Sequence, residues 1–245
     1  MLIDLKDFIR QLRVKLLHMG AVCRGQDLSV KDWGKVVIIA PHPDDEVLGC
    51  GGLIARLVQR GNPPHVVILT RGEHSHVGCC QTSEEDICKG RHQLTLQALQ
   101  LLGLPLTHLH TLAFEDGKVS AANPTEMQKL STLMEELAPD QVFVPHWGEG
   151  WNDHVQVKSL IIPLIPDRTQ LYEYCVWMWY YNVWRLDWKQ ASLLRMTHEE
   201  HALKQQASAA YVELLAPCGK PWSGVLPDVF LKATQWNKEL YFKIR

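Results

Sequence analysis

The 245-residue chain lacks the composition that marks several classes of protein. Its 25 Lys and Arg residues are balanced by 27 Asp and Glu residues, so no basic excess indicates nucleic-acid binding. No apolar run reaches the roughly 18–20 residues that a transmembrane helix needs. The chain also has no internal repeat, low-complexity tract or obvious linker. These absences favour a folded, soluble protein that binds neither nucleic acid nor the membrane interior.

The cysteines lack the regular spacing of a disulfide framework. Seven are present, an odd number, with an adjacent pair at positions 79 and 80 and the others at 23, 50, 88, 175 and 218. This pattern predicts free thiols in a reducing cytoplasm. Charges at positions 4, 6, 7, 10, 13 and 15 break any signal-peptide core and are consistent with that location.

The N-terminal 20 residues predict an amphipathic helix, because their apolar residues recur at helical spacing. A helix packed against the body of the protein is the first interpretation, and a helix lying on a membrane surface is the alternative. The apolar stripe consists of Leu2, Leu5, Phe8, Ile9, Leu12, Leu16 and Leu17.

Short β-branched runs alternate with longer helical patterns along the chain. This order predicts an α/β fold with a Rossmann-like, doubly wound, mostly parallel sheet flanked by helices. The length suits a single domain over residues 1–245. Ligands of such sheets bind beyond the carboxyl ends of the strands. The predicted strands are 35–40, 65–70, 107–112, 141–144 and 171–177, and the predicted helices are 51–60, 84–102, 125–137 and 197–215.

Two strings of histidine and carboxylate residues each follow a predicted strand. The first contains His42 and Asp45, three residues apart across a turn that a proline imposes. The second contains His146 and the pair Asp153-His154. Imidazole and carboxylate are typical zinc ligands, and a catalytic zinc has three protein ligands. Because both strings leave the same edge of the sheet, His154 can complete a site with the first pair, and His146 is the competing third ligand.

The string Pro-His-Pro-Asp-Asp-Glu-Val-Leu-Gly-Cys-Gly-Gly at 41–52 resembles the signature of the LmbE/PIG-L family of zinc N-deacetylases. The resemblance covers about residues 35–211 and implies a Rossmann-like deacetylase domain. Later, shorter matches are Thr70-Arg71-Gly72-Glu73, Arg91, Leu102-Gly103, Asp116-Gly117, Asp153-His154, Tyr172-Glu173-Tyr174 and the helix around Lys204.

The resemblance implies that His42, Asp45 and His154 hold zinc and that Asp44 is the general base. The implied reaction is hydrolysis of the N-acetyl group of a small-molecule amino sugar, an N-acetylglucosaminyl conjugate, to acetate and a free amine. A zinc amidase for a non-sugar acyl group is one alternative. A sugar- or nucleotide-binding protein without catalysis is the other, and the retained Asp44 argues against it.

Three further polar residues are assigned to the surroundings of the metal. Arg71 and Arg91 are candidates for binding sugar hydroxyls or a phosphate, with surface ion pairs as the alternative for each. Arg71 replaces the acidic residue that the family often has at its position. Glu46 is assigned a supporting role beside the ligands, because its side chain heads toward the following helix.

Trp151 occupies the position where many family members have a histidine, three residues before the second metal-binding histidine. Because an indole cannot shuttle a proton at neutral pH, another group must protonate the leaving amine. We expect Asp44 to act first as base and then as acid, with His146 or His74, or zinc alone, as alternatives. Trp151 then becomes a wall of the sugar pocket, and Asp153 orients a neighbouring group.

The segment 177–188 contains four of the nine tryptophans. Packing in the core and loops is the first interpretation, because aromatic side chains mostly supply buried area. A sugar-stacking wall and contact with a membrane interface are the alternatives.

Overall fold

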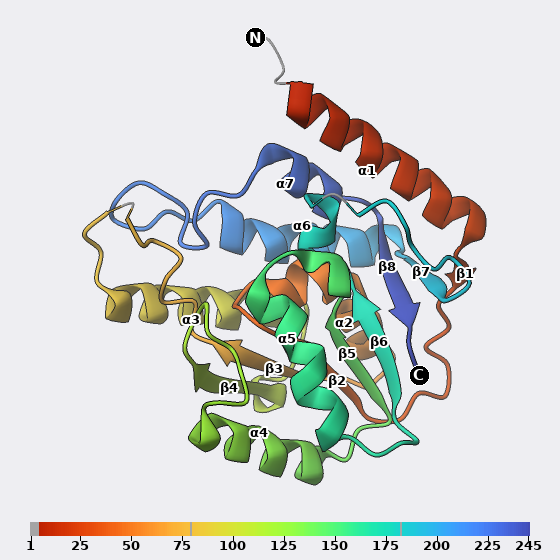
Figure 1. Cartoon of the computed structure of the whole chain (residues 1–245), viewed down its shortest axis with the longest axis horizontal. Coiled ribbons are helices and arrows are strands. Elements are labelled where there is room, and N and C mark those ends of the chain that lie inside the picture. Colours follow the sequence, from red (N-terminus) through yellow and green to blue (C-terminus); the bar gives the residue numbers. More distant parts are fainter. Residues whose placement is uncertain (1–4, 79, 182) are drawn as a thin grey trace.

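A computed structural model describes residues 5–78, 80–181 and 183–245. Within these residues an eight-stranded sheet has the order β1-β7-β8-β6-β5-β2-β3-β4 (Figure 1). Only β8 runs antiparallel to its neighbours, and the other pairs are parallel, which confirms the predicted mostly parallel sheet. The strands are β1 (Gln26–Asp27), β2 (Val36–Ala40), β3 (His65–Thr70), β4 (Leu109–Phe114), β5 (Gln141–Pro145), β6 (Gln170–Tyr174), β7 (Ala191–Arg195) and β8 (Lys238–Lys243).

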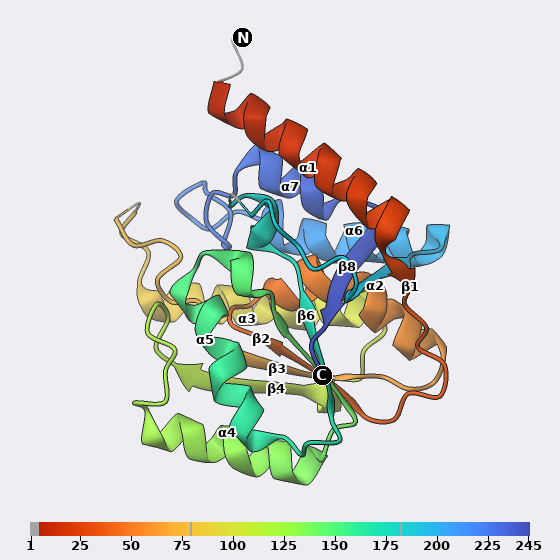
Figure 2. The same cartoon turned by 45° about the vertical axis from the view of Figure 1, so that its right-hand side comes forward.

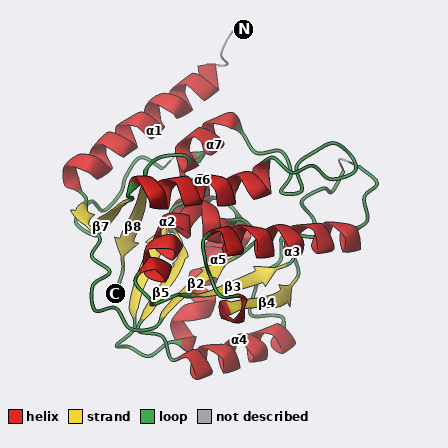
Figure 3. Cartoon of the chain, turned by 180° about the vertical axis from the view of Figure 1, so that it is seen from behind, coloured by secondary structure: helices red, strands yellow, loops and turns green. Residues whose placement is uncertain are grey.

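Helices cover both faces of the sheet, with α2, α3 and α6 on one face and α4 and α5 on the other (Figures 1 and 3). The α-helices are α1 (Leu5–Arg24), α2 (Asp45–Gln59), α3 (Glu84–Leu101), α4 (Pro124–Leu137), α5 (Asn152–Ile161), α6 (His198–Val212) and α7 (Asp228–Thr234). Short 3-10 helices span Leu106–His108, Trp147–Glu149, Ile162–Leu164 and Trp177–Trp179.

Strand β2 shows why the sheet is buried on both faces. Its β-branched side chains alternate between two hydrophobic clusters. Val36 and Ile38 pack with the α2, α3 and α6 side chains, whereas Val37 and Ile39 pack with those of α4 and α5. All five β2 residues are buried.

Local signals set several helix boundaries. The predicted capping box begins α6, because Thr197 Oγ1 accepts a hydrogen bond from the Glu200 N–H (3.2 Å) and the Glu200 carboxylate accepts one from the Thr197 N–H (2.7 Å). Helix α2 begins at Asp45, earlier than predicted, so Asp45 is its first residue and His42 lies in the turn just before it. Strand β4 begins after a 3-10 turn that follows Pro105 and is therefore displaced from the predicted 107–112.

Helix α1 lies at the edge of the molecule, against β7 and α7 (Figure 2). Its buried face consists of Arg13, Val14, Leu17 and Ala21. The packing face is therefore offset from the predicted apolar stripe: Leu5, Phe8, Ile9, Leu12 and Leu16 are exposed, and Leu2 lies outside the described residues. In the described part of the chain, no helix combines the length and apolarity that crossing a membrane requires.

The order of the strands places a switch point beside β2. The chain runs from β2 to β3 and β4 on one side, and then returns to form β5 and β6 on the other. The loops that leave the carboxyl ends of β2 and β5 therefore diverge, and such a crevice is where open α/β sheets bind ligands.

Candidate functional site

Three of the predicted metal ligands meet at this switch point. His42 follows β2, Asp45 is the first residue of α2, and His154 lies in the first turn of α5. The His42 Nδ1 atom is 3.2 Å from Asp45 Oδ2 and 3.3 Å from His154 Nε2. The distance between His154 Nε2 and Asp45 Oδ2 is 3.2 Å. The structure thus brings one atom of each residue to the corners of a nearly equilateral triangle.

The size of this triangle fits a small metal ion. Nitrogen and oxygen ligands about 2.0–2.1 Å from a tetrahedral zinc lie about 3.3–3.4 Å apart. Asp45 and His154 are buried, and His42 is partly exposed, so the triangle is open on one side. Two imidazoles and a carboxylate are also a donor set that zinc accepts. These residues can therefore hold a divalent cation.

Two carboxylates orient His42 from behind. Its Nε2 atom is 3.1 Å from Asp116 Oδ1 and 3.2 Å from Asp153 Oδ2. Burial opposes protonation of the ring, but hydrogen bonds to Asp116, Asp153 and Asp45 outweigh burial and raise the His42 pKa well above its usual value. A metal binds the neutral ring, and in that form the two rear carboxylates hold the remaining proton on Nε2, so the lone pair of Nδ1 points toward the triangle.

Asp153 has a second role, since it accepts hydrogen bonds from the backbone N–H groups of Gly117 (2.7 Å) and Val119 (3.0 Å). It therefore fixes the loop after β4 against the start of α5. Asp116 lies in that loop, where the sequence motif indicates a turn but does not indicate a partner for His42.

Glu149 orients His154 in a similar way, and sequence reasoning assigned it no role. Its Oε2 atom is 3.3 Å from His154 Nδ1, and its carboxylate also accepts the backbone N–H groups of Val176, Trp177 and Met178. Burial lowers the His154 pKa, but Asp45 and Glu149 raise it to about 9. The same negative charges favour a bound cation.

Asp44 lies next to the metal triangle in an unusual backbone conformation, with φ 122°. Its carboxylate accepts a hydrogen bond from Arg91 Nη2 (3.0 Å), and its N–H donates to Glu46 Oε2 (3.0 Å). Tyr211 donates to the other oxygen of Glu46 at 2.5 Å. Burial raises the Asp44 pKa to about 7, although Arg91 opposes the shift. A carboxyl group with this pKa can exchange a proton near neutral pH.

The two arginines proposed from the sequence occupy different places. Arg91 is buried and also donates to the carbonyl oxygens of Pro43 and Gly72, so it holds the Asp44 loop together. Arg71 is exposed and lines a separate hollow of about 240 Å³. The structure therefore brings Arg91, but not Arg71, to the metal triangle.

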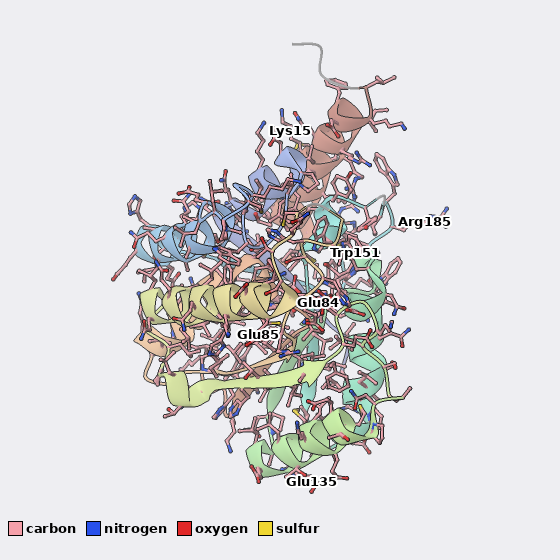
Figure 4. The ribbon with its side chains drawn as sticks, turned by 90° about the vertical axis from the view of Figure 1, so that its left-hand side faces the viewer. Lys15, Glu84, Glu85, Glu135, Trp151 and Arg185 are labelled. Atoms are coloured by element: carbon pink, nitrogen blue, oxygen red, sulfur yellow. The ribbon has the colours of Figure 1, made fainter. Side chains whose placement is uncertain are left out.

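A cavity of about 540 Å³ opens above the triangle. Trp151, labelled in Figure 4, is half-exposed on its wall and contacts Trp177 edge to face, with ring centroids 5.7 Å apart. The lining residues are His42, Asp44, Asp45, Leu48, His74, Ser75, Arg91, Asp116, Gly117, Trp151, Asn152, Asp153, His154, Trp177, Ser223, Gly224, Val225, Leu226 and Phe230. The site thus combines a floor of histidine and carboxylate donors with aromatic and hydroxyl-bearing walls.

The structure does not bring His146 to this cavity. The His146 side chain is buried, its Nδ1 atom accepts the Gly148 N–H (3.0 Å), and its Nε2 atom is 3.7 Å from Glu173 Oε2. Its ring also packs against Phe242. His74, by contrast, lines the cavity and donates from Nδ1 to the Asp116 carbonyl oxygen (2.7 Å).

We expect His146→Ala to affect stability rather than chemistry. The variant leaves the buried Gly148 N–H without its acceptor, which destabilises folding by about 1–3 kcal/mol. Metal content should be unchanged, and kcat should stay within about tenfold of the wild-type value. Thermal unfolding, metal analysis and steady-state kinetics check these outcomes. Loss of kcat in a folded, metal-loaded variant would instead identify His146 as an acid.

The tryptophans of segment 177–188 divide between packing and the cavity wall. Trp179 is buried against α1 and α7, and Trp188 packs near Gly20. Trp177 lines the cavity, where its ring stacks on Phe230 at 4.5 Å. Trp184 is exposed. Residue 182 of this segment lies outside the described residues.

Comparison with known proteins identifies the family. The family model described as GlcNAc-PI de-N-acetylase (PIG-L) matches residues 37–165, more than half of the 245 residues. The chain therefore belongs to this family, which confirms the resemblance carried by the 41–52 motif.

The curated relatives match part of the chain. A 1D-myo-inositol 2-acetamido-2-deoxy-alpha-D-glucopyranoside deacetylase of Corynebacterium kroppenstedtii is 32% identical over 146 residues, or 49% of this chain and 37% of that protein. The uncharacterized deacetylase YaiS of Escherichia coli is 28% identical over 127 residues, or 50% of this chain and 63% of that protein. The matches span about half the length of the curated relatives.

Solved structures share the fold. The conserved protein TT1542 of Thermus thermophilus is 25% identical, with a TM-score of 0.56 over 72% of this chain and 78% of that one. The N,N'-diacetylchitobiose deacetylase of Pyrococcus horikoshii is 18% identical, with a TM-score of 0.59 over 89% of this chain and 82% of that one. These likenesses place the chain in the same α/β fold.

Proposed function

We propose that this protein is a zinc-dependent deacetylase that removes the N-acetyl group from an amino sugar. The observation that carries the proposal is that the three residues of the triangle and Asp44 all line the same cavity. A cation-binding site beside a buried carboxyl group is what metal-assisted amide hydrolysis requires.

The family and its relatives support this substrate class. The family description names a de-N-acetylase of a GlcNAc conjugate, and the C. kroppenstedtii relative is named a deacetylase of a GlcNAc-inositol conjugate. We further propose zinc as the metal, one catalytic domain over residues 1–245, and a cytoplasmic location. The donor set of the triangle supports zinc. The irregular cysteine spacing supports a reducing compartment.

The residues of the site would then have separate roles in the reaction. When bound by His42, Asp45 and His154, zinc supplies a Lewis acid and lowers the pKa of a water molecule toward about 7. Asp44 accepts the proton of the attacking water, and its hydrogen bond from Arg91 keeps the carboxylate aimed into the cavity. When the C–N bond of the amide breaks, Asp44 returns that proton to the leaving nitrogen. The products are acetate and the free amine.

Trp151 and Trp177 form an aromatic corner on the wall of the cavity. The face of an aromatic ring suits the apolar C–H face of a pyranose. Ser75 and Asn152 on the same lining can exchange hydrogen bonds with sugar hydroxyls. This combination favours a sugar over a simple alkyl amide.

Mass spectrometry of products tests the proposed function. Purified protein with zinc is incubated with N-acetylglucosaminyl conjugates and, in parallel, with simple N-acetyl amides of similar size. We expect loss of an acetyl group and a new free amine from the sugars alone. Equal turnover of the simple amides would instead identify a general amidase, and no turnover of either class by zinc-loaded protein would contradict hydrolysis.

Replacing Trp151 by Phe should disturb substrate binding more than chemistry. Phenylalanine keeps an aromatic ring but removes part of the surface that faces the cavity, so we expect KM to rise while kcat stays within about tenfold. Steady-state kinetics on the preferred conjugate measures both constants. The matched control is Trp184→Phe, because Trp184 is also about half exposed but is not among the cavity-lining residues. A selective fall in kcat for the Trp151 variant would contradict its role as a wall.

A further inference from the structure

A second group of metal-ligating side chains lies outside the site described above. His76 and Cys80 belong to the loop between β3 and α3, and Cys218 belongs to the loop between α6 and α7 (Figures 1 and 3). His76 Nδ1 is 3.3 Å from Cys80 Sγ and 3.5 Å from Cys218 Sγ. All three atoms lie within 4.8 Å of one another.

The backbone fixes His76 in the form that binds a metal. His76 is buried, and its Nε2 atom is 2.9 Å from the Pro221 carbonyl oxygen. A carbonyl oxygen can only accept a hydrogen bond, so the ring proton lies on Nε2 and the lone pair of Nδ1 faces the two sulfurs. Metal-binding histidines commonly donate their other N–H to a carbonyl oxygen in this manner.

The loop that carries Cys218 is also organised before any ligand binds. Leu215 and Pro221 pair across it as an isolated β-bridge, and the Ala216 N–H donates to the Lys220 carbonyl oxygen at 2.8 Å. Pro221 thus closes the turn that presents the Cys218 thiol and accepts the hydrogen bond from His76. The two loops are joined again where Ser75 Oγ donates to the Trp222 carbonyl oxygen (3.2 Å).

We propose that His76, Cys80 and Cys218 bind a second, thiophilic metal ion, for which zinc is the natural occupant. A tetrahedral zinc with Zn–S of about 2.3 Å and Zn–N of about 2.0–2.1 Å separates sulfur from nitrogen by about 3.6 Å. The two observed separations are shorter by a few tenths of an ångström at most. The three donors leave one coordination position, which water can occupy.

Neither hydrogen bonding nor a disulfide explains this geometry as fully as a bound metal ion does. Without an ion, Nδ1 can accept from the Cys218 thiol while the Cys80 thiol donates to Thr82 Oγ1 at 3.3 Å. That arrangement satisfies each thiol separately but gives no reason for Cys80 Sγ to lie 3.3 Å from the same Nδ1 atom, whereas an ion is a shared partner for all three donors. A disulfide between Cys80 and Cys218 would join the sulfurs but would not use the oriented lone pair of His76.

The proposed ion would connect two sides of the cavity mouth. Ser75, in the loop with His76 and Cys80, lines the cavity. Ser223, Gly224 and Val225, in the loop with Cys218, also line it. An ion shared by the two loops would therefore hold this part of the rim in place, at a position separate from the His42 triangle. This assignment does not depend on the proposed deacetylase activity.

Cobalt substitution tests the second site independently of activity. Metal-free protein, kept reduced, is titrated with Co²⁺ and followed by absorption and metal analysis. We expect about two ions per chain, one for each three-donor site. We also expect a thiolate-to-cobalt charge-transfer band in the near ultraviolet, which a site without sulfur cannot produce. Absence of this band in folded wild-type protein would overturn the proposal without any need for a variant.

Substitutions then identify the residues that produce the charge-transfer band. Cys80→Ser and Cys218→Ser should each abolish it and remove about one ion per chain, because each takes one of three donors. Cys23→Ser is the matched control, since Cys23 is an exposed cysteine on α1. His154→Ala should keep the band and lose the other ion. A band that survives in both loop variants would contradict the assignment, as would a Cys80–Cys218 disulfide that the reductant does not open.

Discussion

Replacing Asp44 by Asn should lower kcat by roughly a hundredfold or more while zinc stays bound. The amide cannot accept the proton of the attacking water at neutral pH, and it has none to return to the leaving nitrogen. Its oxygen can still accept the hydrogen bond from Arg91, so the loop should keep its shape. Single-turnover kinetics together with metal analysis measures the two effects separately.

The control for this variant is Glu46→Gln. Burial raises the pKa of Glu46 to about 8, so its carboxyl group is largely neutral at pH 7 and glutamine matches its size and charge. The glutamine oxygen can accept the Asp44 N–H, and its amide N–H can donate to the Tyr211 hydroxyl, which reverses the direction of that one hydrogen bond. We expect a loss of less than about tenfold, because Glu46 supports the Asp44 backbone but does not face the reaction. Near-normal turnover by zinc-loaded Asp44→Asn would remove Asp44 from the mechanism.

The predictable part of the fold is the part with strong local signals. Strands β2 and β3 are β-branched runs buried on both faces, and helix α6 begins with a capping box, so composition and spacing sufficed. Strands β7 and β8 were not predicted. They are as long as β2 and β3 but lack a β-branched run, and they depend on distant partners, since β8 pairs antiparallel with both β6 and β7. Such pairing leaves little trace in the local sequence.

The candidate site shows the same division between local and distant effects. His42, Asp44 and Asp45 follow a recognisable strand, so their place at the edge of the sheet could be predicted. Glu149 and Asp116 could not be assigned, because their roles depend on which histidine nitrogen each carboxylate meets after folding. Their burial beside the ligands is a tertiary property.

The positions of Arg71 and Arg91 in the fold also explain why only Arg91 reaches the Asp44 loop. Arg91 lies on α3, which packs beside the Asp44 loop, and its guanidinium reaches Pro43 and Gly72. Arg71 immediately follows β3 and turns toward the other hollow. Its exposed position removes the geometric support for a direct contact with a substrate in the larger cavity.

Replacing His154 by Ala should remove the ion from the His42 triangle and abolish most activity. The change deletes one corner of the triangle, leaving Nδ1 of His42 and Oδ2 of Asp45 as the two remaining donors. Loss of a partner that only orients a ligand lowers metal affinity by about 10–100-fold, so loss of a ligand should have a larger effect. Turnover should therefore fall by more than about a hundredfold at limiting zinc.

The matched control is His146→Ala, which removes a histidine of similar burial that does not line the cavity. It should keep its zinc, whereas His154→Ala should lose about one ion per chain relative to wild type. Glu149 would also lose its partner in the His154 variant, so circular dichroism must show that both variants are folded before metal is counted. If folded His154→Ala retains full zinc occupancy, the third ligand has been assigned to the wrong residue. Excess zinc that restores turnover would instead show that His154 contributes affinity rather than chemistry, because the remaining residues would still position the water and Asp44.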